Sequence, residues 1–90
     1  MPQAEVVVRH EVGLHARPAT LFVRLAASFP CEVKVRNVST NSPSVNAKSI
    51  LGVLSIGVNR DDTIAIETDG EQADEALNAL VQLVKDNFGE

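Results

Sequence analysis

The chain has 90 residues, a formal net charge of −4 at pH 7 and only three aromatic side chains, all of them phenylalanine. A chain of this length is expected to form one domain over residues 1–90, with a single aliphatic core. The low aromatic content argues against modules that stack nucleic-acid bases, and the acidic balance disfavours nonspecific binding to nucleic acid or anionic membranes. No apolar run reaches the ~18 residues of a membrane span, and the first residues lack the features of a signal peptide, so a cytoplasmic protein is expected.

The charges are spread unevenly along the chain. The charged residues of 61–90 are all acidic except Lys85, whereas the first half of the chain carries the basic residues Arg9, Arg17, Arg24, Lys34 and Arg36. A locally positive site in an acidic protein suits a phosphate group or an acidic partner surface.

The single cysteine, Cys31, cannot form an internal disulfide, and we expect it as a small buried side chain. No cluster has the spacing of a metal site, so neither a metal nor another cofactor is expected.

The hydrophobic pattern predicts seven elements. Four strands are expected over residues 4–9, 31–38, 44–46 and 63–68, and helices over residues 16–29 and 48–56 and from a capping box at residues 69–72 to about residue 87. In the first helix the apolar residues recur at i, i+3, i+4 and i+7, and residues 31–36 alternate between apolar and polar. The apolar segment 48–56 is short enough that a strand stays an alternative.

The order of these elements predicts the topology. A crossover helix makes the first two strands parallel, and the turn after the second strand makes the third antiparallel to it. The last strand then fits between the first and second strands and is antiparallel to both. We therefore predict an α+β fold, an open-faced β-sandwich with a four-stranded antiparallel sheet of order 1-4-2-3 and three helices on one face.

The candidate site is His15, at the start of the first predicted helix. Gly13 loosens the backbone before it, and Pro18 fits the first helical turn because it needs no N–H donor there. The free N–H groups of a helix start form an anion site, and the Arg17 guanidinium suits phosphate oxygens. A plain capping role is the alternative for His15, whereas His10 lacks such a setting and is expected on the surface.

Nothing else in the sequence has the pattern of an active site. There is no phosphate-binding glycine loop, no metal cluster, and no second histidine or carboxylate pair placed as a general base. A nucleophilic histidine that accepts and passes on a phosphoryl group needs none of these. The residues therefore favour a phosphoryl-group carrier with a covalent phosphohistidine over a self-sufficient enzyme.

Two motifs in this chain resemble those of a known family. They are Gly13-Leu14-His15-Ala16-Arg17-Pro18-Ala19-Thr20 and Asn46-Ala47-Lys48-Ser49-Ile50-Leu51-Gly52-Val53. The first is similar to the active-site signature of HPr, the histidine-containing phosphocarrier of the bacterial sugar phosphotransferase system, and the second to the serine-site segment of that family. The length and the order of the predicted elements also fit, so the resemblance covers essentially the whole chain.

The resemblance implies a set of roles and partners. His15 would accept a phosphoryl group on Nδ1 from phosphorylated Enzyme I, which is charged by phosphoenolpyruvate, and pass it to IIA domains of sugar permeases. Arg17 would contact the phosphate, and no cofactor would stay on the carrier. Ser49 is by itself expected to cap the second helix, and the resemblance implies regulatory phosphorylation there by HPr kinase/phosphorylase.

The second helix has more apolar positions than one buried stripe needs. We expect an exposed apolar patch near His15, formed by Ile50 and Leu51 together with Leu54, at the centre of a partner-binding surface. The polar part of that surface is expected to include Thr20 and the basic residues Arg17, Arg24 and Lys48.

Two alternatives stay open. One is a carrier of the same family in a nitrogen- or metabolism-linked regulatory phosphorelay, and the other is a noncatalytic α/β interaction domain with a capping histidine. Transient docking to large partners favours a monomer. The sequence does not name the sugars, because the permease domains select them.

Overall fold

The computed structural model describes residues 2–89. The strands are β1 (Gln3–Val7), β2 (Glu32–Asn37), β3 (Val45–Asn46) and β4 (Thr63–Asp69), and the helices are α1 (Ala16–Ala27), α2 (Ile50–Ser55), α3 (Ala73–Lys85) and the 3₁₀ turn η1 (Asn87–Gly89). All neighbouring strands are antiparallel, in the order β1-β4-β2-β3, so the predicted topology is confirmed. Within the described residues, no helix is long and apolar enough to cross a membrane.

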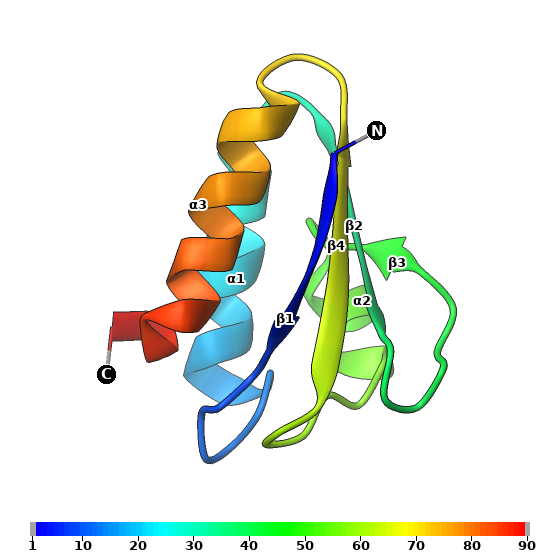
Figure 1. Cartoon of the computed structure of the whole chain (residues 1–90), viewed down its shortest axis with the longest axis vertical. Coiled ribbons are helices and arrows are strands. Elements are labelled where there is room, and N and C mark those ends of the chain that lie inside the picture. Colours follow the sequence, from blue (N-terminus) through cyan, green and yellow to red (C-terminus); the bar gives the residue numbers. More distant parts are fainter. Residues whose placement is uncertain (1, 90) are drawn as a thin grey trace.

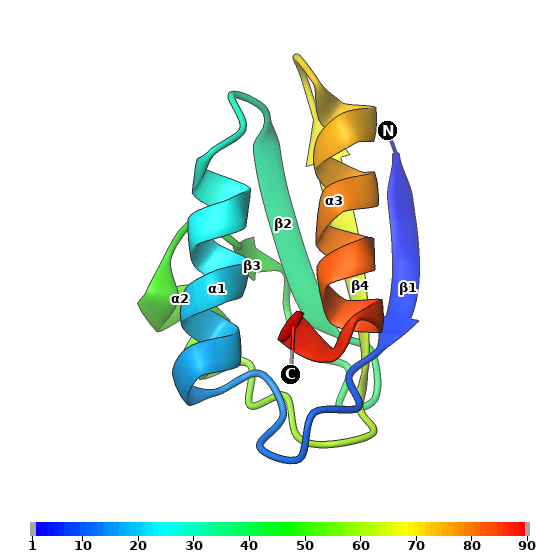
Figure 2. The same ribbon diagram turned by 90° about the vertical axis from the view of Figure 1, so that its left-hand side faces the viewer.

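The sheet has one covered face and one open face. Figures 1 and 2 show α1 and α3 lying side by side across one face, while α2 packs beside α1 and next to β3. The alternation of each strand turns its apolar residues to the covered face, where Val35 lies opposite Ile66 and both are fully buried. Phe22 of α1 and Leu80 of α3 complete this core, and Cys31 is a buried free thiol, as expected.

The helix interpretation of the second apolar segment is confirmed, with shorter bounds. Helix α2 covers six residues, and Val53 is its buried residue. Helix α1 ends at Ala27, two residues earlier than predicted, and β3 is a two-residue strand. The short α2 buries one narrow stripe and leaves its other apolar side chains toward solvent.

The predicted capping box at the start of the last helix is wrong. Strand β4 continues to Asp69, which pairs with Glu32, so Asp69 belongs to the sheet. Gly70, with φ of +114°, makes the turn, and Gln72 occupies the N-cap with φ of +63° and no side-chain cap hydrogen bond. Sheet pairing thus overrides the local capping signal.

The expected surface position of His10 is only partly confirmed. His10 is half-buried, and its ring meets the buried Phe88 edge-on, with ring centroids 5.9 Å apart. Phe88 belongs to η1, which follows α3 and folds back toward the loops at the start of α1 (Figure 2). A contact between residues this far apart in the chain has no local signature in the sequence.

Candidate functional site

The loop before α1 is anchored at Gly13 and Leu14. Gly13 has φ of +70°, and a Cβ atom built on it would lie 2.3 Å from the Val58 carbonyl oxygen, so only glycine fits there. Its N–H closes a turn by donating to the His10 carbonyl at 2.8 Å, and the N–H of the fully buried Leu14 donates to the Val58 carbonyl at 3.0 Å. The residue that follows this double anchor is His15.

His15 is the N-cap of α1, as predicted. Its backbone is extended, with φ of −131° and ψ of 168°, and its carbonyl accepts the Ala19 N–H at 3.4 Å. Its side chain makes no capping hydrogen bond and is half-buried. The imidazole therefore does not cap α1, and its ring nitrogens make no hydrogen bond to the N–H groups at the start of the helix.

The residue after His15 is strained. Ala16 has φ of +52°, in the left-handed region, which costs an L-residue other than glycine about 1–2 kcal/mol. Its carbonyl accepts the Thr20 hydroxyl at 3.2 Å, and both residues are exposed. The sequence gives no sign of this strain because alanine, unlike glycine or asparagine, has no preference for such backbone angles.

The electrostatic setting of the helix start is positive. The first turn of α1 carries no acidic residue, and Arg17 is exposed. Among residues 2–89 the one ion pair joins Arg9 to Asp61, so the Arg17 guanidinium is unpaired there. A cation near helix N–H groups favours an incoming anion with tetrahedral oxygens, such as a phosphoryl group.

Ser49 is the N-cap of α2, and its hydroxyl is already used. Its oxygen accepts the Gly52 N–H at 3.1 Å, and the side chain is half-buried. The neighbouring Lys48 is half-buried and donates from Nζ to the Phe29 carbonyl at 2.7 Å. Ser49 therefore caps α2, and the Lys48 ammonium is bound to a backbone carbonyl of the same domain.

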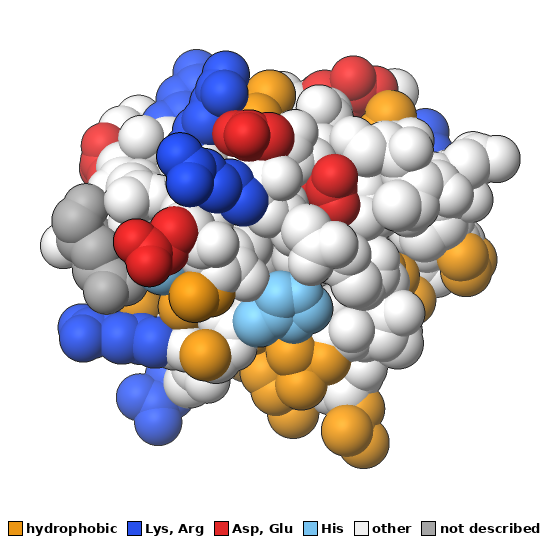
Figure 3. Space-filling model, turned by 90° about the horizontal axis from the view of Figure 1, so that it is seen from below, with side chains coloured by type: hydrophobic (Ala, Val, Ile, Leu, Met, Phe, Trp, Pro, Cys, Tyr) orange, Lys and Arg blue, Asp and Glu red, His pale blue; other side chains and the backbone are white. Residues whose placement is uncertain are grey.

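The apolar patch of Ile50, Leu51 and Leu54 lies on the surface, as predicted. These side chains are 40%, 78% and 38% exposed, and Val12, in the loop before His15, is 43% exposed. Seen from the end of the molecule that carries the loops, hydrophobic side chains gather beside a histidine (Figure 3). The exposure of Val12 was not predicted, because an isolated valine in a loop carries no pattern.

A protein-family model described as "PTS-HPr: PTS HPr component phosphorylation site" matches residues 2–86. The chain belongs to the HPr family. It is 42% identical over 91 residues to the phosphocarrier protein HPr of Pseudomonas aeruginosa, and the match covers 100% of this chain and 98% of that protein.

Two further comparisons extend this result. The crystal structure of HPr-C-His from Thermoanaerobacter tengcongensis is similar with a TM-score of 0.94 and 38% identity, over 100% of this chain and 98% of that one. The multiphosphoryl transfer protein of Salmonella typhimurium is 36% identical over 97% of this chain, which spans 23% of that protein. An HPr-family domain thus also occurs as part of a longer protein.

The structure brings together some of the predicted site residues of this HPr-family chain and separates others. His15, Arg17 and Thr20 share the start of α1, whereas the exposed Arg24 lies in its last turn, about 13 Å of helix rise from His15. Ser49 and the apolar patch belong to α2, which packs on α1. In the described part of the chain no group of three or more His, Cys, Asp or Glu side chains could hold a metal ion.

Proposed function

We propose that the chain is a phosphoryl carrier of the phosphoenolpyruvate-dependent sugar phosphotransferase system. His15 accepts a phosphoryl group from phosphorylated Enzyme I and passes it to IIA domains of sugar permeases. The observation that carries this proposal is an imidazole without a capping hydrogen bond, next to an unpaired Arg17, at a helix start in a family described by its phosphorylation site.

The chemistry needs one nucleophilic nitrogen and a place for the charge of the phosphoryl group. The lone pair of His15 Nδ1 attacks phosphorus, a nitrogen–phosphorus bond forms, and the bond from phosphorus to the donor breaks with its electron pair left on the donor. The Arg17 guanidinium and the free N–H groups at the start of α1 are expected to contact the phosphoryl oxygens. Transfer to a IIA domain repeats the same exchange, with phosphohistidine as the donor.

The surface around His15 suits large partners. The exposed apolar patch provides the desolvated centre of a docking surface, and Arg17 with Thr20 provides polar contacts beside it. Arg24 and Lys48 are expected to extend this surface toward the other end of α1, where the Lys48 Nζ donates to the Phe29 carbonyl. Both Enzyme I and IIA domains are expected to use this surface in turn.

The deciding experiment is phosphorylation by phosphoenolpyruvate and a purified Enzyme I. We expect a mass increase of one phosphoryl group that is labile in acid and stable in base, as a phosphohistidine is. His15→Gln abolishes it, and the matched variant His10→Gln retains it, since the His10 side chain is engaged within the fold, where its ring packs on Phe88 and its Nδ1 accepts the Val12 N–H. An unlabelled wild-type chain with an Enzyme I that labels another HPr would contradict the proposal.

Ser49 is proposed as a regulatory site for HPr kinase/phosphorylase. Its oxygen accepts the Gly52 N–H, so the bulk and charge of a phosphate on that oxygen would disturb the helix cap. A phosphate there would add negative charge beside the apolar patch and repel an acidic docking surface. With kinase and ATP, Ser49→Ala should remove labelling while Ser55→Ala, on the exposed side of the same helix, should leave it; equal labelling of Ser49→Ala and wild type would contradict the assignment.

The chain is proposed to act in the cytoplasm as a monomer. A carrier that docks transiently to several large partners needs the surface around His15 to be free of other subunits. Light scattering at assay concentration tests the monomer, and transfer to sugar-type against nitrogen-type IIA domains separates sugar uptake from a regulatory phosphorelay. Faster transfer to a sugar-type IIA domain is the expected result.

A further inference from the structure

The backbone that precedes His15 rests on the segment 56–62. The Leu14 N–H donates to the Val58 carbonyl at 3.0 Å, and a Cβ on Gly13 would lie 2.3 Å from the Val58 oxygen and 2.7 Å from the Asn59 Cα. The two backbones are thus in close contact with no side chain between them. A shift of Val58 and Asn59 would displace the loop immediately before His15.

The segment 56–62 is closed on itself by Asp62. The Asp62 carboxylate accepts the Asn59 N–H at 2.9 Å through Oδ2, and the Asp62 N–H donates to the Asn59 carbonyl at 3.0 Å. Residues 61 and 62 are also joined to the extension of β1, because the Val8 N–H donates to the Asp62 carbonyl at 2.9 Å. The end of the segment is therefore fixed by both a side chain and a backbone contact.

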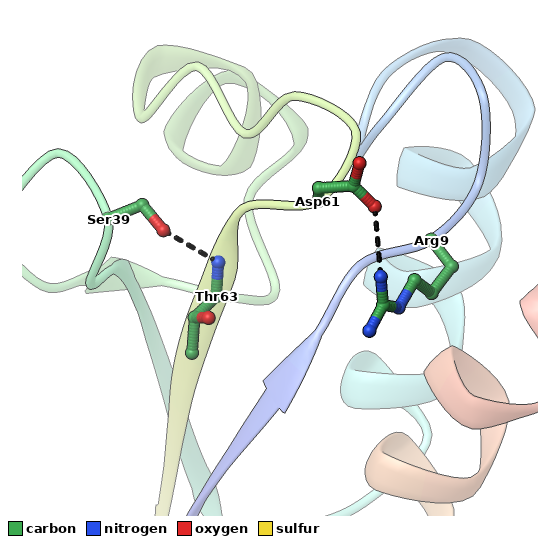
Figure 4. Close-up of polar contacts among 4 residues, drawn as sticks. All are labelled: Arg9, Ser39, Asp61 and Thr63. Carbon is green, nitrogen blue, oxygen red and sulfur yellow. Dashed lines mark hydrogen bonds and ion pairs between the residues drawn. The ribbon is translucent and has the colours of Figure 1, made fainter.

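Two side-chain contacts flank the segment on the surface. Figure 4 shows the ion pair of Arg9 with Asp61 at 3.2 Å and the Thr63 N–H donating to the Ser39 hydroxyl at 2.9 Å. The side chains of Arg9 and Asp61 are 72% and 61% exposed, and ion pairs this exposed to water contribute little to stability. A further side-chain contact to the segment comes from the interior.

That contact is made by Asn37, the last residue of β2, which is fully buried. Its Nδ2 donates to the Ile56 carbonyl at 3.3 Å and to Asp62 Oδ2 at 3.1 Å, and its Oδ1 accepts the Thr40 N–H at 3.4 Å. The orientation of the amide follows from these partners, since the reverse orientation would face one oxygen with two others. One amide nitrogen thus holds both ends of the segment on which Gly13 and Leu14 rest.

We propose that Asn37 is a positioning residue for His15. It acts through the segment 56–62, whose ends it ties together, and so keeps the backbone before His15 in the geometry needed for phosphoryl transfer. The inference rests on the proposed function of His15 as the phosphoryl acceptor. A buried amide holds such a position well, because leaving the buried Ile56 carbonyl without a donor is unfavourable.

The test variant is Asn37→Asp, which keeps the shape and replaces the donor by an oxygen. That oxygen faces the Ile56 carbonyl and the Asp62 carboxylate, so the segment loses its tie and loosens. With Enzyme I and phosphoenolpyruvate, the turnover of His15 phosphorylation at saturating carrier should fall about tenfold. The KM for the carrier should stay within about twofold, because Asn37 is buried away from the docking surface.

The matched control is Thr68→Val, at the other buried polar residue of the described chain. Thr68 lies near the far end of β4 and donates from Oγ1 to the Ala73 carbonyl at 2.7 Å, so its replacement lowers stability without touching the segment 56–62. Hydrogen exchange of the Leu14 N–H supplies a second measurement. It should speed up in Asn37→Asp and stay unchanged in Thr68→Val.

A second variant covers the case that Asn37→Asp does not fold. Asp62 is half-buried, and Asp62→Ala removes the acceptor shared by Asn37 and Asn59, so a smaller loss of turnover with faster Leu14 exchange is expected. Wild-type turnover in both variants, or a loss no larger than that of Thr68→Val, would overturn the proposal. If wild type is not phosphorylated at all, the proposed function fails instead, and Leu14 exchange alone decides the positioning: equal rates in Asn37→Asp and Thr68→Val overturn it.

Discussion

Two helix starts in this molecule carry a candidate phosphorylation residue, and they are built differently. At the start of α1 the His15 side chain makes no capping hydrogen bond, and the backbone strain falls on Ala16. At the start of α2 the Ser49 side chain caps its helix, and its backbone is unstrained, with φ of −108°. The first arrangement leaves the His15 ring without a capping contact, as the proposed role of a phosphoryl acceptor requires, whereas the Ser49 hydroxyl is already engaged in a helix cap.

The largest effect is expected from Gly13→Ala, because it pushes the loop before His15 off its support. The new Cβ would meet the Val58 carbonyl oxygen at 2.3 Å while φ stays positive, so the free energy of unfolding should fall by about 2–4 kcal/mol. Gly57→Ala is the matched control, since Gly57 has φ of +56° and open space around a Cβ; its cost should be about 1 kcal/mol. Urea unfolding measures both, and equal losses would show that the contact with Val58 does not hold the loop.

Arg17→Ala tests the charge at the α1 start. The guanidinium has no carboxylate partner in the described chain, so its removal should leave stability unchanged and lower the turnover of phosphorylation about 100-fold. Arg24→Ala, at the other end of the same helix, should change the KM and not the turnover. Similar losses of turnover in both variants would assign the effect to overall charge.

The layers of the fold and the position of His15 could be predicted from the sequence, because they depend on local patterns of residues. Alternation in residues 31–36 and the helical spacing of α1 give the layers, and the order of elements gives the sheet. The position of His15 at the α1 N-cap follows from Gly13 and Pro18. The remaining features are tertiary: Asp69 pairs within the sheet, and His10 meets Phe88 across the chain.

Asn37 shows the same limit. In the sequence it lies where the predicted strand 31–38 meets a polar, turn-rich stretch, and nothing distinguishes it from an ordinary turn residue. Its burial and its contacts with Ile56 and Asp62 depend on segments that only the folded chain brings together. The contact of Lys48 with the Phe29 carbonyl has the same origin, because it depends on the packing of α2 on α1.

Leu51→Ser tests whether the α2 start serves partner docking. Leu51 is 78% exposed, so stability should change by less than about 0.5 kcal/mol while the KM for phosphorylation by Enzyme I rises about fivefold. The control Asn78→Ser, exposed on α3, should change neither quantity. An unchanged KM in Leu51→Ser would remove the apolar patch from the docking surface.

The smallest effect on transfer is expected from Ser49→Ala. Loss of the cap should cost about 1 kcal/mol of stability, because the Gly52 N–H loses its acceptor, while phosphorylation of His15 proceeds at the wild-type rate. Thermal unfolding and the Enzyme I assay measure the two quantities. A loss of transfer in this variant would mean that the two helix starts are coupled even without modification.

The most direct test of the account is nuclear magnetic resonance of the histidine ring nitrogens in the 15N-labelled chain, before and after treatment with Enzyme I and phosphoenolpyruvate. The account predicts that the Nδ1 resonance of His15 moves and couples to phosphorus while both ring nitrogens of His10 stay in place. Coupling to phosphorus at His10, or at neither histidine with a competent Enzyme I, would contradict it.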